Sequence, residues 1–141
     1  PEFDDLEVEE QAMRHALQYP SVHKSLLFLI SWPALDAAEE LVLTRSTELD
    51  GDYYQVLTPA AEALQEKHLL ASTILRRELI DFALMKGRSS RYWHAARHLQ
   101  ECAYLAELID DFGSFETHDD YQSRLRSEHG RKLGFWRLVT A

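Results

Sequence analysis

Residues 69–112 constrain the fold more than any other part of the chain, because they carry two long helical patterns joined by a short polar turn. In the first pattern, apolar side chains recur at steps of three and four residues, which places them on one face of an α-helix. They are Leu70, Ile74, Leu75, Leu79, Phe82, Ala83 and Met85. The charged residues between them are expected to face solvent, and these are Arg76, Arg77, Glu78 and Asp81.

The turn at residues 87–90 separates the two helices. Gly87 can adopt the left-handed conformation of a C-terminal helix cap, because glycine has no Cβ to clash. Ser89 or Ser90 is expected to cap the second helix, and Gly113 to end it. Its apolar face consists of Tyr92, Ala95, Ala96, Leu99, Cys102, Ala103, Leu105, Ala106 and Ile109. The alanines predict that another helix backbone approaches closely, so the two helices should form an antiparallel hairpin.

Further helices are predicted at residues 4–19, 22–30, 33–47, 52–67 and 117–130. In the first, Leu6, Met13, Ala16 and Leu17 are expected to point inward. The second, capped by Ser21, is apolar on most sides and is expected to be buried at the centre. The fourth crosses Pro59 and is predicted as one kinked helix, with a fresh helix capped by Thr58 as the alternative.

Residues 117–139 should complete the fold. Thr117 is a plausible N-terminal cap, and Gly130 should end the helix that follows. Tyr121, Leu125 and His129 share one of its faces. A short helix or extended tail over residues 131–139 is expected to dock on the body, because its apolar side chains Phe135, Trp136 and Leu138 would be costly to leave in water.

No segment shows sustained strand alternation, so the fold class predicted is all-α. Short turns favour antiparallel helical hairpins, packed as a compact tetratricopeptide-like bundle or short solenoid of about seven or eight helices. Residues 4–141 are expected to form a single domain, and residues 1–3 look like a cloning remnant. The chain is expected to be the C-terminal part of a longer protein.

Two stretches resemble known families. In the second helix, larger and smaller residues alternate in the order Tyr92, Ala95, Leu99 and Cys102. This order resembles the second helix of a tetratricopeptide repeat. The run Arg-Ser-Ser-Arg-Tyr-Trp-His-Ala-Ala-Arg-His-Leu at residues 88–99, and the His-Gly-Arg-Lys turn at residues 129–132 followed by aromatic residues, resemble an uncharacterised bacterial family built on helical hairpins. That family is similar to helical segments that accompany zinc-binding SWIM modules. The resemblance implies no established activity.

The net charge of −9 is concentrated in the first half of the chain. Residues 1–70 carry four basic and fourteen acidic side chains, whereas residues 71–141 carry eleven and ten. A negative field repels phosphate backbones, so nucleic acid is not expected as a partner. No apolar run approaches the roughly 20 residues of a membrane span. The single cysteine fits a reducing compartment, so a cytoplasmic location is expected without a membrane partner.

His94 and His98 are four residues apart and therefore share one helix face. Such a pair could bind one metal ion, with His118, Asp119 or Glu101 as further ligands. The stronger expectation is a polar pair that lines a groove, because no metalloprotease-type glutamate lies between the histidines. No metal and no cofactor are therefore assigned.

Basic residues could converge beside these histidines if the final segment folds back on the central hairpin. They are Arg88, Arg91, Arg97, Arg131 and Lys132, and together they would suit a carboxylate or phosphate. The stronger expectation is that they balance the charges of Asp110, Asp111, Glu116 and Asp119. Tyr92, Trp93 and Trp136 could line the same groove, although aromatic residues at helical spacing also suit a core.

The sequence contains no nucleotide-cradling glycine loop, no nucleophile elbow and no paired-cysteine motif, so an enzyme is not expected. The main hypothesis is a protein-interaction or scaffolding module of a cytoplasmic bacterial protein. Its partner would be a protein segment or another domain of the same chain. The alternative is a small-ligand or metal-binding domain that uses the face of His94 and His98 with the nearby arginines.

Overall fold

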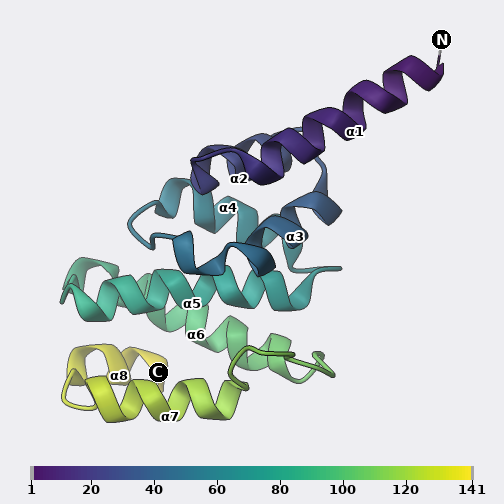
Figure 1. The fold of residues 1–141 in the computed structure, drawn as a ribbon. Helices are drawn as coiled ribbons and strands as arrows, with labels where there is room; N and C mark the ends of the chain where they lie inside the picture. The colour runs from purple at the N-terminus through teal and green to yellow at the C-terminus, as the bar shows by residue number, and fades with distance from the viewer. Residues whose placement is uncertain (1, 141) are drawn as a thin grey trace.

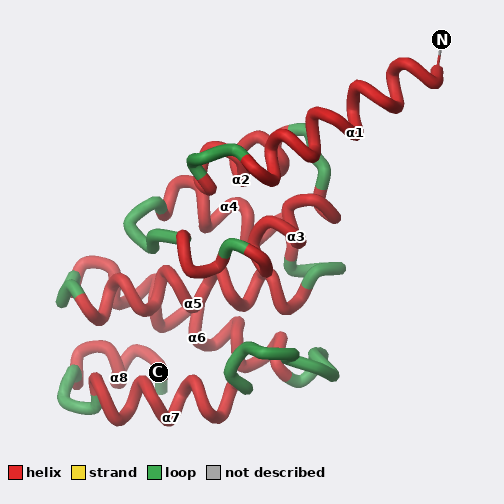
Figure 2. The backbone as a smooth tube through the Cα atoms, viewed as in Figure 1, coloured by secondary structure: helices red, strands yellow, loops and turns green. Residues whose placement is uncertain are grey.

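The computed structural model describes residues 2–140, with side chains from Asp5 onward, and every regular element in that range is helical (Figures 1 and 2). The eight α-helices are α1 (Glu2–Gln18), α2 (Val22–Ser31), α3 (Leu35–Thr44), α4 (Tyr54–Leu64), α5 (Leu69–Met85), α6 (Tyr92–Ala106), α7 (His118–His129) and α8 (Leu133–Val139). Two short 3₁₀ turns, η1 (Ser46–Glu48) and η2 (Ser89–Arg91), precede α4 and α6. The all-α class and the expected number of helices are confirmed. Residues 1–3, the expected cloning remnant, have side chains that lie outside the described part of the structure.

The helices are stacked from α1 at one end of the molecule to α7 and α8 at the other, and α8 packs against α6 (Figure 1). Helix α5 lies in the middle and packs against both α4 and α6. Two clusters of buried apolar side chains result. One joins α1–α4 to the first half of α5, and the other joins the second half of α5 to α6, α7 and α8.

The first two helices confirm the predicted boundaries, but two of the predicted burials are wrong. Ser21 caps α2 by accepting a hydrogen bond from the Lys24 backbone N–H at 3.2 Å. Leu6, expected to point inward, is 61% exposed, because the N-terminal half of α1 extends beyond the body (Figure 1). Helix α2 is not central either. It lies near the edge of the molecule, and its Leu27 and Phe28 are exposed.

Helix α3 ends three residues before the predicted boundary because Arg45 leaves the helix. Its guanidinium donates to the carbonyls of Tyr19 and Pro20 at 2.6 and 3.1 Å, which joins the end of α3 to the end of α1. Helix α4 runs through Pro59 without interruption, so the single helix is confirmed and the fresh start at Thr58 is not needed.

Helix α5 differs most from its prediction. The supposed solvent face is buried, since Arg76 and Arg77 are only 5% and 6% exposed, whereas Met85 is 73% exposed. Neighbouring helices and the loop after α6 surround α5 until its last turn. An amphipathic pattern therefore identified the helix but not its surroundings.

Helix α6 starts and ends differently from the prediction. Gly87 has φ +60° and provides the expected cap of α5. Neither Ser89 nor Ser90 caps α6 with its side chain, because both lie in the turn η2. The helix ends at Ala106 rather than near Gly113, which has φ +59° and donates its backbone N–H to Asp111 Oδ1 at 2.8 Å. This local side-chain hydrogen bond stabilises a turn in place of a longer helix.

The C-terminal prediction is confirmed. Thr117 Oγ1 accepts from the Asp120 backbone N–H at 3.2 Å, and helix α7 ends before Gly130. The tail forms α8 and docks through Phe135 and Trp136, which are buried in the second cluster. The Trp136 indole N–H donates to the His129 carbonyl at 2.9 Å, so the ring is satisfied as well as buried.

Candidate functional site

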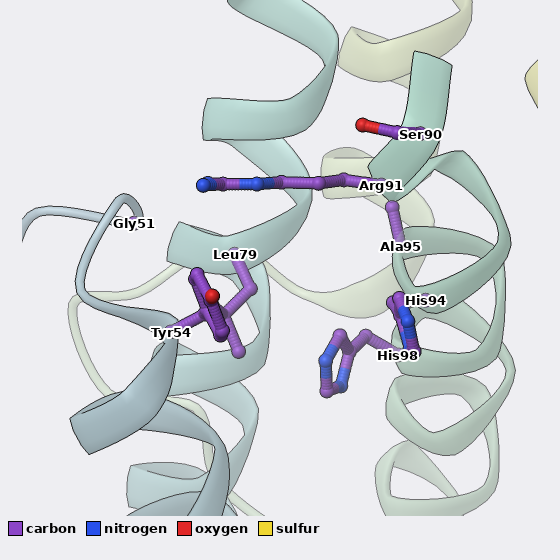
Figure 3. A pocket seen from close by; sticks show the side chains of 8 residues that line it. All are labelled: Gly51, Tyr54, Leu79, Ser90, Arg91, His94, Ala95 and His98. Atoms are coloured by element: carbon purple, nitrogen blue, oxygen red, sulfur yellow. The ribbon is translucent and has the colours of Figure 1, made fainter. Parts of the chain in front are cut away.

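A cavity of about 390 Å³ lies where the loop before α4 meets α5 and the first turns of α6 (Figure 3). The loop contributes Gly51, the start of α4 contributes Tyr54, and α5 contributes Leu79. The turn η2 contributes Arg91, and α6 contributes His94 and His98. Gly51 allows this arrangement, because a Cβ at that position would overlap the Glu78 carbonyl oxygen on α5. The loop is thus held directly against the central helix.

His98 is oriented by a buried arginine from α5. The Arg76 Nη1 donates to His98 Nδ1 at 2.9 Å, and the Arg76 Nη2 donates to Gln65 Oε1 at 2.6 Å. A guanidinium has no acceptor, so Nδ1 accepts and the proton of the neutral imidazole is on Nε2. Burial, and then the positive charge of Arg76, lower the pKa of His98 to about 4. His98 is therefore a neutral N–H donor at neutral pH.

Arg91, at the end of η2, crosses the cavity toward the loop that contains Gly51 (Figure 3). Its Nη2 donates to Asp52 Oδ1 at 3.0 Å, and its guanidinium carbon lies 4.9 Å from the ring centres of both Tyr54 and Phe82. Among the described residues its Nη1 has no hydrogen-bond partner although that atom is buried. Cation–π contacts and one carboxylate thus fix the position of Arg91, and an N–H donor of its guanidinium stays unpaired.

Exposed aromatic and basic side chains continue the site on the outer face of α6. Trp93 is 56% exposed and packs edge-on against His94, with ring centres 5.1 Å apart. The Arg97 guanidinium lies 5.6 Å from the centre of the Trp93 ring. Tyr54, at the cavity wall, is 47% exposed.

Only some of the ten residues expected in one groove come together. Arg91, His94 and His98 line the cavity, and Trp93 and Arg97 adjoin it. The remaining five lie elsewhere and are described next.

Helix α8 docks in a way that separates the C-terminal residues from this site. Arg131 and Lys132 line a different polar cavity at the end of α7, about 630 Å³ in volume. Trp136 is buried, and the guanidinium carbon of Arg126 lies 4.0 Å from the centre of its ring. Tyr92 packs edge-on against Phe135 with ring centres 6.0 Å apart. Arg88 is exposed in the turn before α6.

The geometry does not favour a metal at the histidine pair. Within residues 5–140 no group of three or more His, Cys, Asp or Glu side chains is arranged to hold a metal ion. His98 already accepts from Arg76 at Nδ1, and the guanidinium would repel a second cation.

The site residues that sequence reasoning missed had only weak signals in the sequence. Gly51 lies between the helices predicted at residues 33–47 and 52–67, and Tyr54 lies within the second of them, so their spacing marks neither as a site residue. Arg76 was assigned to solvent, although two adjacent arginines inside an otherwise apolar helix are a sign that one of them has a buried partner. Its partners Gln65 and His98 are 11 and 22 residues away, so local spacing could not find them.

A second polar cavity, about 320 Å³ in volume, lies between α5, α7 and the loop after α6. Arg77 borders it and is 6% exposed, and its Nε and Nη2 have no partner among the described residues. The guanidinium instead lies 4.7 Å from the centre of the Tyr121 ring. Burial, and then the charges of Asp81 and Asp50, raise the pKa of Glu78 to about 7.

Comparison with known proteins identifies a family but no activity. The model of a family of unknown function (DUF6880) matches residues 1–138. No curated protein and no solved structure matches the chain significantly. Among the described residues, no helix combines the length and apolar character needed to cross a membrane.

Proposed function

Because the chain belongs to the family of unknown function DUF6880, which brings no activity with it, we propose a function from the site itself. The protein is a protein-interaction module that takes a carboxylate of a partner segment into the cavity of Arg91, His94 and His98. The observation that carries this proposal is the bond from Arg76 to His98 Nδ1, because it leaves Nε2–H as the donor available to the cavity that His98 lines.

The chemistry of the cavity suits one carboxylate with an apolar neighbour. Arg91 and His98 supply N–H donors, and hydrogen bonds between a guanidinium and a carboxylate are among the stronger ones in proteins. Leu79 and Ala95 supply an apolar wall. Because Asp50 and Asp52 lie in the adjoining loop, a segment with many negative charges would be repelled. A single carboxylate in an otherwise apolar or basic segment fits best.

The surroundings of the cavity favour a protein partner over a free metabolite. At about 390 Å³, the cavity is at the small end of the range for ligand pockets, roughly 300–1,000 Å³. A short segment with its carboxylate side chain or chain terminus fits in such a space. Tyr54, Trp93 and Arg97 surround it, and these residue types are enriched at the centres of protein interfaces.

The proposal includes the role and setting of the protein. We infer a scaffolding role without catalysis, in the cytoplasm of a bacterium. The buried thiol of Cys102 is consistent with a reducing compartment, because it is fully covered and burial raises its pKa to about 12. Such a thiol is neither a ready nucleophile nor a disulfide partner.

A random peptide library displayed on phage, selected against the 141-residue chain, tests the proposal. Enriched peptides should share one Asp, Glu or free C-terminal carboxylate beside an apolar residue. Calorimetry on synthetic peptides should then show at least a tenfold weaker affinity when that carboxylate is converted to its amide. The Arg91→Ala variant should show the same loss, whereas Arg137→Ala, an exposed arginine on α8, should bind like the wild type.

Two results would contradict the proposal. One is a set of selected peptides that bind Arg91→Ala and wild type equally. The other is saturable binding of a simple dicarboxylate such as succinate with no peptide selected, which would support the small-ligand alternative instead.

A further inference from the structure

The N-terminal half of α1 carries apolar side chains that nothing covers within the described chain. Helix α1 extends from the body as a single rod, and its far end contacts no other element (Figure 1). Leu6 and Val8 are 61% and 64% exposed. A helical segment as short as this free half is marginal in water without tertiary packing, so its uncovered apolar side chains favour a partner surface.

An apolar groove begins where α1 reaches the body. It has a volume of about 290 Å³ and is bordered by Ala12, His15 and Tyr19 of α1 and by Lys24, Ser25 and Phe28 of α2. Tyr19 and Phe28 are 38% and 47% exposed. Ser25 is only 2% exposed, and among the described residues its hydroxyl has no hydrogen-bond partner. The groove therefore has an open apolar surface and an unused donor at its edge.

One continuous stripe joins the free half of α1 to this groove. Val8, Ala12, Ala16 and Tyr19 follow one another at steps of four, four and three residues, so they lie on one face of the helix. Ala16 is only 5% exposed and lies at the bottom of the groove. Ala12 lies at the middle of the stripe. A small residue there allows a second helix to approach closely.

The charges along α1 would complement those of a second copy of α1 laid antiparallel to it. The free half carries Asp5, Glu7, Glu9 and Glu10, of which Glu10 pairs with Arg14 of the same helix, whereas the groove is bordered by His15 of α1 and Lys24 of α2. A second α1 laid antiparallel would bring its acidic half to the basic groove and its own groove to the first acidic half. The same two contacts would form twice.

We infer that two copies of this chain associate through α1, with the free half of each helix lying in the α1–α2 groove of the other. The helices run antiparallel about a two-fold axis near Ala12, which places Val8 of one copy opposite Ala16 of the other. This contact is isologous and closes on itself, as in most homodimers. Met85 and Leu133 are also exposed, but they lie far apart in the chain and away from α1.

Sedimentation velocity over a concentration series from about 1 to 100 µM tests the inference, a range chosen for micromolar self-association. The wild-type chain should pass from monomer to dimer, and no larger species should form. Val8→Asp should weaken dimerisation at least tenfold, while Met85→Asp, an equally exposed apolar position away from α1, should behave like the wild type. A chain that stays monomeric throughout, or equal effects of the two variants, would overturn the inference.

Charge reversal tests the antiparallel register separately from the fold. Glu9→Lys and Lys24→Glu should each weaken the dimer several-fold, and the double variant should recover most of the loss because the attraction is restored with its signs exchanged. Ala12→Cys should also form a disulfide-linked dimer on mild oxidation much faster than Met85→Cys, since the native Cys102 is buried. A double variant as weak as the sum of the singles, or equal crosslinking rates, would contradict this register.

Discussion

Arg76 and Arg77, at the centre of α5, are both buried but differ in their hydrogen-bond partners. Arg76 donates to His98 and Gln65 at 2.9 and 2.6 Å, whereas two nitrogens of Arg77 have no partner among the described residues and its guanidinium lies over the Tyr121 ring. With 3.6 residues per helical turn, neighbouring side chains point about 100° apart. Arg76 therefore faces the candidate site and Arg77 faces the cavity beside α7.

Arg76 orients another side chain, whereas Arg77 mainly packs against its neighbours. Arg76 fixes the tautomer of His98, so its loss should change what the cavity can bind. Arg77 orients no such hydrogen-bond donor. Its guanidinium carbon lies 4.7 Å from the ring centre of Tyr121 and 5.7 Å from that of Phe112. Equal burial thus does not imply an equal contribution to stability or function.

The largest expected effect contrasts the two arginines directly. Arg76→Met should lower the free energy of unfolding by roughly 2–3 kcal/mol, because it leaves buried acceptors on His98 and Gln65 without a donor. Arg77→Met should stay within about 1 kcal/mol of the wild type, because replacing a poorly paired buried charge by an apolar side chain is often neutral. Urea unfolding of both variants measures the difference. Equal losses would show that the two arginines are equivalent.

The second prediction uses pH, because the two sides of α5 should respond with opposite signs. The pKa of His98 is lowered from 6.5 to about 4, so only the unfolded chain takes up its proton between these values. The stability that His98 contributes is thus present above pH 6.5 and is lost as the pH falls to about 4, by at most roughly 3 kcal/mol. His98→Gln should remove this loss.

Glu78 provides the matched case. Its pKa is raised from 4.5 to about 7, so the native state keeps a proton that the unfolded chain releases. Its contribution is present below pH 4.5 and is lost as the pH rises to about 7. Denaturant titrations of wild type, His98→Gln and Glu78→Gln from pH 4 to 8 measure the two differences. Difference curves of the same sign would contradict the assignment.

A smaller loss is expected on the α7 side. The Tyr121 hydroxyl donates to Asp81 Oδ1 at 2.8 Å and also lies 3.3 Å from the Arg77 carbonyl. Tyr121→Phe should cost about 1–2 kcal/mol, because a partly buried carboxylate loses its donor while the ring remains. Thermal and urea unfolding should agree on this value. Peptide binding at the Arg91 site should not change.

The smallest stability effect is expected at His94. The residue is exposed, so His94→Ala should change the free energy of unfolding by no more than about 0.5 kcal/mol. Because His94 lines the cavity, the same variant should weaken peptide binding several-fold. Calorimetry and urea unfolding on one preparation separate the two quantities. A large loss of stability with unchanged binding would give His94 a structural role.

Local chemistry made much of the fold predictable from the sequence. Ser21 and Thr117 each accept a backbone N–H at a helix start, and Gly87 takes the positive φ of a cap. These features depend on three or four neighbouring residues, so spacing alone reveals them. The apolar periodicity likewise located the helices, although the predicted end of α6 near Gly113 lies beyond its observed end at Ala106, and the last segment was expected as either a short helix or an extended tail.

Long-range packing limited the rest. The burial of Arg76 and Arg77 depends on Gln65, His98 and Tyr121, which belong to other helices. The spacing of His94 and His98 correctly put both beside one cavity. It could not show that docking of α8 through Phe135 and Trp136 places Arg131 and Lys132 at the end of α7 instead.

The central claim is that Arg76 holds His98 as a neutral Nε2–H donor beside the cavity. Nitrogen-15 NMR of the histidine rings tests it most directly, because the two ring nitrogens report protonation and tautomer separately. We predict that His98 is in the Nε2–H form from pH 8 down to about 5, in line with its pKa near 4, and that its Nε2 resonance shifts when a selected carboxylate peptide is added. A ring that is protonated at pH 6, or that carries its proton on Nδ1, would contradict the account.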